Sequence, residues 1–183
     1  MTQDRDERLM SEVAQGRQEA LEPLIRRHAN PLLTFIRRMI GDYHRSEELF
    51  QDVFVAVWAK RKQYESPRPF KPWLYAIALN VCRAEFRRRW TPVFPIQDED
   101  VIAGANAKDP GGEVAIATEQ ATIVSAAVRQ LPPKQRAVVV LRTWSALSYA
   151  EIADVLGRSE GTIRAHMHQA LATLREYLEP RLR

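Results

Sequence analysis

The chain has 183 residues, 45% of them hydrophobic, which is enough to form one or two small domains with cores of their own. Its 27 Lys and Arg residues outnumber its 23 Asp and Glu residues, and the net charge of +4 favours a polyanionic partner without proving one. The N-terminus, MTQDRDERLM, is charged where a signal peptide is apolar, and the longest aliphatic run, residues 137–141, is far too short to span a bilayer. We therefore expect a cytoplasmic protein that is neither secreted nor inserted into a membrane.

The residue patterns that signal catalysis or metal binding are missing from the sequence. A single cysteine, Cys82, cannot form an internal disulfide, and its spacing from the four histidines offers no metal site. His166 and His168 are two residues apart on a predicted helix, so they point to roughly opposite sides. There is also no glycine-rich phosphate loop and no convincing nucleophile–base pair. We expect no catalytic residue, no metal and no cofactor.

Residues 4–90 have helical periodicity, with predicted interruptions at Gly16, Asn30-Pro31, Gly41 and residues 66–72. The clearest helix spans about residues 46–62, where Ser46 is the expected N-cap and the apolar stripe comprises Leu49, Phe50, Val53, Phe54, Val57 and Trp58. Beside this stripe lies a polar, acidic edge formed by Glu48, Gln51 and Asp52. It suits a basic partner helix, although a solvated helix face is the commoner explanation for such a cluster.

A second long helix is predicted to start near Pro72 and to bury Trp73, Ile77 and Val81. Its opposite face carries Asn80, Arg83 and Arg87, and the face is extended by Arg88, Arg89 and Trp90. Guanidinium groups hold phosphates, while Asn and nearby aromatic rings can bond to or stack on unpaired bases; the candidate rings are Phe70, Tyr75 and Trp90. The alternative is a solvated basic face whose neighbouring aromatic residues belong to the core.

The segment 91–118 contains three prolines, a Pro-Gly-Gly turn and the acidic triplet 98–100, with little periodicity, which predicts a flexible connection. It has one basic and five acidic residues, whereas residues 1–90 have 17 basic and 12 acidic, and residues 119–183 have nine and six. The pattern predicts an all-α fold of two small basic domains, residues 1–90 and 119–183, joined by an acidic linker.

Helical periodicity resumes at residues 119–130, stops at Leu131-Pro132-Pro133 and continues to Trp144. The next helix opens with a capping box formed by Ser148 and Glu151 and ends at Gly157, and Ser159 can cap the helix that follows. Two short helices joined in this way are typical of a helix-turn-helix, whose second helix enters the DNA major groove. On that helix, the polar side chains placed to contact DNA are Ser159, Glu160, Thr162, Arg164, His168 and Gln169. An ordinary helical hairpin with a polar face would show the same pattern.

Both halves carry motifs that resemble extracytoplasmic-function sigma factors of the sigma-70 family. Residues 47–54 (EELFQDVF) and 70–80 (FKPWLYAIALN) resemble region 2 of that family. Residues 131–136 (LPPKQR), 147–153 (LSYAEIA) and 161–164 (GTIR) resemble region 4. The two regions occur in the family's order, and Glu85 stands where the family commonly has an aspartate.

The resemblance implies a transcription-initiation factor that binds core RNA polymerase and directs it to promoters. Region 2 would bind the polymerase beta-prime coiled coil through Glu48, Gln51 and Asp52, and would capture the melted minus-ten element. The residues implied for that element are Phe70, Lys71, Tyr75, Asn80, Arg83, Arg87 and Arg88, together with the loop 64–71. Region 4 would contact the polymerase beta flap and read the minus-thirty-five element through Arg164 and its neighbours. The linker would thread toward the polymerase active-site channel, and an anti-sigma factor is an expected partner.

Two other functions fit parts of the sequence. A helix-turn-helix repressor or activator would bind operator DNA without polymerase and use residues 1–118 for sensing or dimerisation, but neither a ligand pocket nor a dimer seam is evident. A nucleic-acid-modifying enzyme would need a catalytic constellation, and the sequence supplies none.

Overall fold

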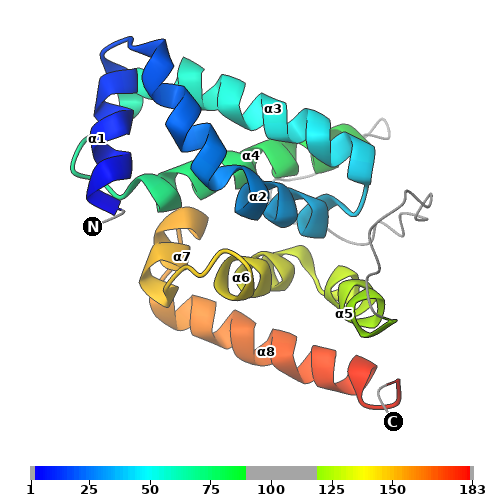
Figure 1. Ribbon diagram of the computed structural model, residues 1–183. Helices are drawn as coiled ribbons and strands as arrows, with labels where there is room; N and C mark the ends of the chain where they lie inside the picture. Colours follow the sequence, from blue (N-terminus) through cyan, green and yellow to red (C-terminus); the bar gives the residue numbers. More distant parts are fainter. Residues whose placement is uncertain (1–2, 90–118, 182–183) are drawn as a thin grey trace.

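The computed structural model describes residues 3–89 and 119–181, and every regular element in these two segments is helical (Figure 1). The first segment, here called the first half, contains α1 (Gln3–Ala14), η1 (Gln18–Ala20), α2 (Leu21–Ile40), α3 (Tyr43–Ala59), η2 (Arg61–Gln63) and α4 (Phe70–Arg89). The second half contains α5 (Glu119–Gln130), α6 (Pro133–Thr143), α7 (Tyr149–Leu156) and α8 (Glu160–Leu178). The all-α prediction is confirmed, while the predicted linker, residues 91–118, and Trp90 lie outside the described residues.

The first half forms around α2, α3 and α4, which pack on one another, and α1 packs against α2 and α4. Apolar side chains at three- and four-residue spacing turn one face of each helix inward, and those with no exposed surface include Leu24, Leu32, Phe35, Val53, Val57 and Leu74. Phe35 and Tyr75 meet edge to face with ring centroids 5.3 Å apart. Burying each large apolar side chain stabilises the fold by about 1.5–3 kcal/mol, so this shared core holds the four helices together.

Two predicted boundaries in the first half are wrong, and each has a local cause. Helix α3 is capped by Asp42, whose side chain accepts a hydrogen bond from the Arg45 backbone at 3.0 Å, so the helix begins one turn earlier than Ser46. The Ser46 hydroxyl bonds instead to the Asp42 carbonyl within that first turn. Helix α2 continues through Pro31, because its apolar face is buried on both sides of the proline at His28 and Leu32.

The second half begins and ends its helices as predicted. Ser148 and Glu151 form the capping box, with the Glu151 backbone donating to the Ser148 hydroxyl at 3.2 Å and the Glu151 carboxylate accepting from the Ser148 backbone at 2.7 Å. Gly157 ends α7 with a φ of 63°, a left-handed conformation that favours glycine, and the chain then turns into α8. Ile163, Met167 and Ala170 on α8 are buried, and α8 packs against α6 and α7.

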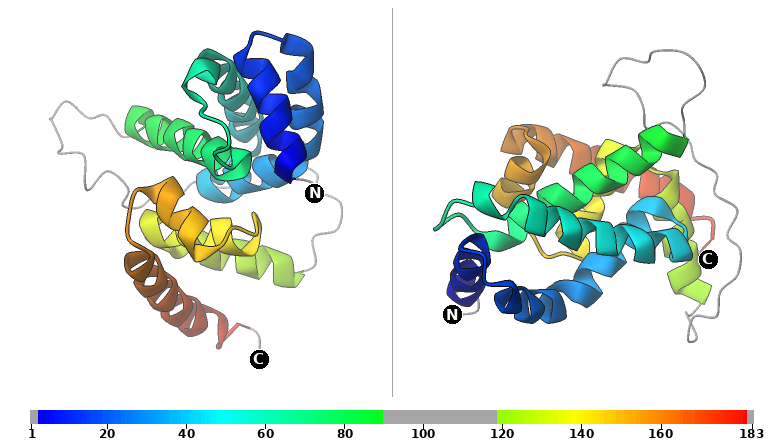
Figure 2. Two further views of the ribbon diagram at one scale, coloured as in Figure 1. Left: turned by 90° about the vertical axis from the view of Figure 1, so that its left-hand side faces the viewer. Right: turned by 90° about the horizontal axis from the view of Figure 1, so that it is seen from above.

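The two halves pack directly on each other. Helix α6 lies against α2 and helix α7 against α4, and Figure 1 and the left-hand view of Figure 2 place α6 and α7 between the first half and α8. Buried residues from both halves form one continuous hydrophobic cluster. In residues 3–89 and 119–181, no helix combines the length and apolarity that crossing a bilayer requires.

Candidate nucleic-acid interface

The first candidate surface is the N-terminal face of α8. Ser159 caps the helix by accepting a hydrogen bond from the Thr162 backbone at 3.2 Å, and its hydroxyl lies 2.9 Å from the Thr162 hydroxyl. Ser159, Glu160, His168 and Gln169 are exposed, and Thr162 is half-buried. Because Ile163 and Met167 hold the opposite side of the helix in the core, the polar side chains project outward from a fixed support.

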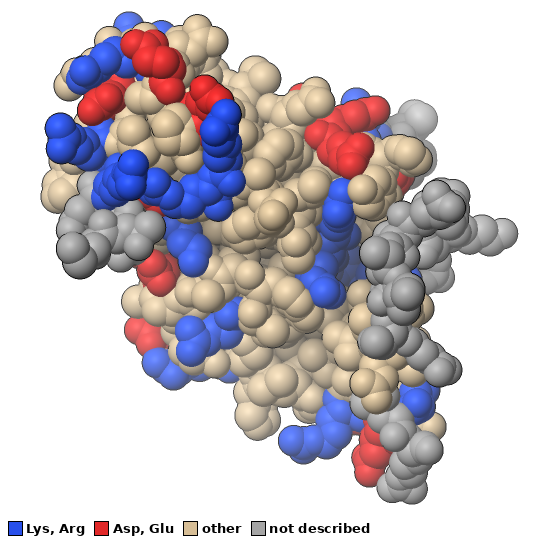
Figure 3. All heavy atoms as spheres, viewed as in Figure 1, with Lys and Arg blue, Asp and Glu red and all other residues tan. Residues whose placement is uncertain are grey.

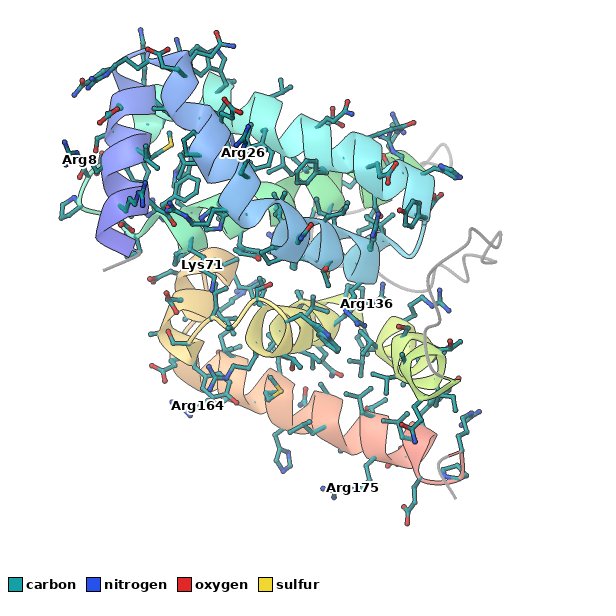
Figure 4. The ribbon with its side chains drawn as sticks, viewed as in Figure 1. Arg8, Arg26, Lys71, Arg136, Arg164 and Arg175 are labelled. Carbon is teal, nitrogen blue, oxygen red and sulfur yellow. The ribbon has the colours of Figure 1, made fainter. Side chains whose placement is uncertain are left out.

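Arg164 occupies the centre of this exposed face (Figure 4). Its guanidinium pairs with Glu160 one turn earlier and lies over the Tyr149 ring, 4.4 Å from the centroid. The side chain remains 60% exposed, so a base edge or phosphate can still reach it. Helical spacing predicts the exposure of Arg164 but not its support by Tyr149, since that ring comes from α7 and the contact depends on the angle between the two helices.

Gln169 lies further along α8 and is partly engaged within the protein. The Gln135 side chain of α6 donates a hydrogen bond to the Gln169 side-chain oxygen at 3.3 Å. This contact orients the Gln169 amide through its oxygen and does not use its NH₂ group. By helical spacing, Glu160, Arg164 and His168 share one side of α8 and Thr162 and Gln169 share another, and Arg164 is the most strongly supported of the six predicted residues.

The second candidate surface is one side of α4. Asn80, Arg87 and Arg88 are exposed, and Arg83 and Lys71 are half-buried. Burial lowers the pKa of Arg83, and the cations Arg158 and Arg87 add to the effect. Arg83, Arg87 and Asn80 are three to seven residues apart, so they share one side of the helix.

Two of the predicted minus-ten residues are buried. Phe70 has no exposed area and Tyr75 is 1% exposed, because both rings pack into the core. Burial raises the pKa of Tyr75, an effect that the nearby Ser145 hydroxyl partly offsets. In this conformation neither ring can stack on a base. In the predicted loop 64–71, Tyr64 is also buried, whereas residues 65–69 are exposed.

An ion-pair network that the sequence did not reveal connects α3 to the far end of α4. The Glu85 carboxylate, whose side chain is 2% exposed, accepts from Arg45 at 2.7 Å and lies 3.1 Å from Arg88. Arg45 also pairs with Glu48 on the surface of α3. The hydrogen bonds to Glu85 and Glu48 raise the pKa of Arg45, so this guanidinium is charged at every physiological pH.

The third surface is the outer side of α3. Glu48, Gln51 and Asp52 are exposed, as predicted for an acidic edge, and Val55 beside them is 67% exposed. An exposed apolar side chain next to carboxylates suits a protein partner that brings both basic and apolar groups. Periodicity did not single out Val55, because one apolar residue outside a stripe carries no pattern.

Basic side chains occur over both halves of the face seen in Figure 3, interspersed with acidic ones, and form no single continuous patch. Within the described segments, no group of three or more His, Cys, Asp or Glu side chains is placed to hold a metal ion. The candidate surfaces therefore offer charge, hydrogen bonds and shape to a partner.

Comparisons with known proteins agree with this arrangement. The family model described as Sigma-70 region 2 matches residues 24–91, and the model described as Sigma-70, region 4 matches residues 121–174. The RNA polymerase sigma factor CarQ of Myxococcus xanthus is 31% identical, with 92% of this chain and 95% of that protein covered. The ECF RNA polymerase sigma factor SigE of Mycolicibacterium smegmatis is 34% identical over 90% of this chain, which spans 65% of that protein.

A solved structure shows the same fold. CnrH of Cupriavidus metallidurans, in complex with the cytosolic domain of CnrY, superposes with a TM-score of 0.74 at 26% identity, covering 96% of this chain and 98% of that one. A helix-turn-helix behind a four-helix first half is the arrangement expected of a DNA-binding transcription factor. The chain belongs to the extracytoplasmic-function group of the sigma-70 family of bacterial RNA polymerase sigma factors. As a sigma factor it directs RNA polymerase to promoters at initiation and is not itself an enzyme.

Proposed function

We propose that the three surfaces divide promoter recognition among them. The exposed side of α4, with Asn80, Arg83 and Arg87, captures the unpaired minus-ten strand, and Lys71 and Arg88 hold its phosphates. The N-terminal face of α8 reads the minus-thirty-five duplex, with Arg164 donating to a guanine and Glu160 accepting from a cytosine. The observation that carries this assignment is the position of Arg164, which is exposed on α8 and supported by Tyr149.

The outer side of α3 is the proposed polymerase-binding surface. Glu48, Gln51 and Asp52 offer carboxylates and an amide to a basic helix such as the beta-prime coiled coil, and Val55 adds apolar area. The second half would contact the beta flap. Binding to core polymerase first and to DNA second is consistent with the modest net charge of +4, which is small for a protein that binds DNA alone.

The domain boundaries and location are part of the same proposal. Residues 1–90 form region 2, residues 119–183 form region 4, and the acidic segment 91–118 connects them through the polymerase. Core polymerase and promoter DNA lie in the cytoplasm, so the protein acts there. Because the related CnrH structure is a complex with the cytosolic domain of CnrY, we include a protein inhibitor, an anti-sigma factor, among the partners.

The deciding experiment is transcription in vitro with purified core polymerase and a genomic promoter library, with and without this protein. Transcripts that depend on the protein and share paired upstream motifs are the expected result and supply the consensus. Operator binding without polymerase, and no new transcripts, would favour a repressor or activator. Purification from unstressed native cells should recover an inhibitory protein, and its absence would count against the anti-sigma partner.

A further inference from the structure

The segment that connects η2 to α4 is exposed along its length and anchored at both ends. Residues 65–69, here called loop 65–69, are exposed, and Figure 1 shows this connection passing beside α1. At one end the Tyr64 ring lies 5.2 Å from the Trp73 ring, and the Tyr64 hydroxyl donates to the Arg68 carbonyl. At the other end the fully buried Phe70 begins α4. The position of the loop therefore depends on how these two ends are held.

The N-terminal end of α4 is capped by a side chain from α1. The Phe70 backbone N–H donates to Glu7 Oε1 at 3.0 Å, across 63 residues of sequence. The residue before Phe70 is Pro69, which has no polar side chain to act as an N-cap. A carboxylate at this point also lies at the positive end of the α4 dipole. Helix α1 thus supplies the cap that a residue next to the helix usually provides, and it ties down the end of loop 65–69.

The neighbouring carboxylate on α1 supports the Phe70 ring. Asp6 is 5% exposed, pairs with Arg27, and lies 2.9 Å from His28 Nε2. Burial, together with the charge of Arg27, lowers the pKa of His28 to about 4, so the imidazole is neutral at physiological pH and its Nε2–H donates to Asp6. The His28 ring meets the Phe70 ring edge to face, with centroids 5.3 Å apart. Two adjacent carboxylates of α1 therefore act on the backbone and the ring of one residue.

The anchored loop lies next to a residue assigned to the minus-ten strand. Lys71, proposed to hold a phosphate, follows Arg68 by three positions, so their Cα atoms are at most roughly 11 Å apart. An unpaired base beside that phosphate lies within reach of the loop. The exposed Ser66 and Arg68 side chains can bond to the edge of such a base. Contacts to base edges carry sequence preference, whereas phosphate contacts only position the strand.

We propose that Glu7 is a positioning residue for minus-ten recognition. Its hydrogen bond to the start of α4 holds loop 65–69 in the conformation that meets an unpaired base, and Asp6 supports the same corner through His28. Glu7 acts through the loop and does not touch the DNA, because a carboxylate repels phosphate. The inference rests on the proposed role of α4, including Lys71, in binding the minus-ten strand.

Three variants separate the cap from the charge of α1. Glu7→Ala removes the acceptor, whereas Glu7→Gln keeps an oxygen acceptor and removes the charge. Glu12→Ala is the matched control, because Glu12 is on the same helix and its carboxylate pairs with the exposed Arg8 and Arg17. The position of the loop is measured on the full chain by hydrogen–deuterium exchange of a peptide covering residues 64–71. We expect exchange about fivefold faster or more in Glu7→Ala, and wild-type exchange in the other two variants.

Base preference is measured with holoenzyme reconstituted from core polymerase and each variant. The DNA panel consists of promoter fragments with a pre-melted minus-ten region, in which each base of that element is varied in turn. In Glu7→Ala the ratio of affinities for the best and second-best base should fall by about fivefold or more at one position, and Glu7→Gln should restore it. Minus-thirty-five preference and affinity for core polymerase should stay unchanged. A loss of folded protein would lower binding to every fragment alike and would leave these ratios intact.

Wild-type base ratios in Glu7→Ala, when the wild-type protein itself shows a minus-ten preference, would overturn the proposal. So would unchanged exchange of peptide 64–71 in Glu7→Ala, or an equal loss of preference in Glu7→Gln or Glu12→Ala, which would assign the effect to charge. A wild-type protein that supports no promoter-dependent transcription is a different result, and it would contradict the proposed function.

Discussion

Arg164 shows how a single exposed side chain is prepared for recognition. Its guanidinium is held between Glu160 and the Tyr149 ring before any DNA is present, which lowers the conformational entropy lost on binding. We expect Arg164→Ala to weaken recognition of a cognate promoter by about 1–3 kcal/mol and to relax preference at one or two base pairs. Transcription from a panel of minus-thirty-five variants measures both effects.

Arg175→Ala is the matched control for Arg164, because Arg175 is exposed on the same helix but lies in its last turn. It should leave base preference intact. A promoter panel in which Arg164→Ala and wild type rank all sequences alike would remove Arg164 from the set of reading residues.

The buried thiol of Cys82 is expected to react slowly with thiol reagents. Burial, together with the charge of Glu85, raises the pKa of this thiol to about 12. At neutral pH the reactive thiolate fraction is then about a thousandfold smaller than for an ordinary cysteine. A thiol reagent such as dithionitrobenzoate should therefore modify the folded protein only as fast as it opens, and the denatured chain at once. Rapid modification under native conditions would contradict the buried position.

The helical pattern predicts the positions of charged residues better than those of aromatic ones. Arg87, Arg88 and Asn80 are exposed as the helical pattern predicted, because polar side chains at helical spacing avoid the core. Phe70 and Tyr75 were assigned to base stacking but lie in the core. An aromatic residue near a basic face fits either base stacking or burial in the core. Only the packing of α4 on α2 and its neighbours decides between the two.

At the scale of the element, the capping box of α7 sets where the helix-turn-helix begins. Ser148→Ala removes the hydroxyl that accepts from the Glu151 backbone and should lower the free energy of unfolding by about 1 kcal/mol. Urea denaturation followed by circular dichroism measures this change. The matched control is Ser11→Ala, since that hydroxyl bonds only to the Glu7 carbonyl inside α1. An equal loss in both variants would show that the cap contributes nothing specific.

The capping signals in the sequence predict the helix boundaries of the second half more accurately than those of the first half. Ser148, Gly157 and Ser159 each act through a local hydrogen bond or a backbone angle, so sequence alone defines them. In α2, by contrast, Pro31 is a breaker by local rules, yet the helix continues because its flanking residues are held in the core. The cap of α3 was misplaced because Asp42 and Ser46 are both good N-caps, one turn apart.

At the scale of the whole molecule, Arg136 links stability of the second half to its contact with the first. Hydrogen bonds from a charged donor contribute about 1.5–3 kcal/mol each, and Arg136→Met removes three of them. We expect this variant to unfold in two steps, the second half first, whereas wild type unfolds in one. Tryptophan fluorescence and circular dichroism, recorded across the same urea series, distinguish the two cases. Coincident transitions in Arg136→Met would show that the buried arginine does not couple the halves.

No sequence pattern predicted the contact between the halves. Each half has complete motifs of its own, and the two-domain interpretation treats them as separate bodies joined by residues 91–118. Arg136 belongs to a stretch, residues 131–136, that resembles region 4, and nothing in its spacing indicates a partner 97 residues earlier in the chain. Contacts of this kind depend on the shape of two finished surfaces.

The fit at Gly41 has a consequence for genetics. Its φ of 76° favours glycine, and an added Cβ would press on Arg129 of the other half. Gly41→Ala should therefore weaken the contact between the halves and lower the free energy of unfolding, and a screen for second-site changes that partly restore stability should return smaller side chains at Arg129.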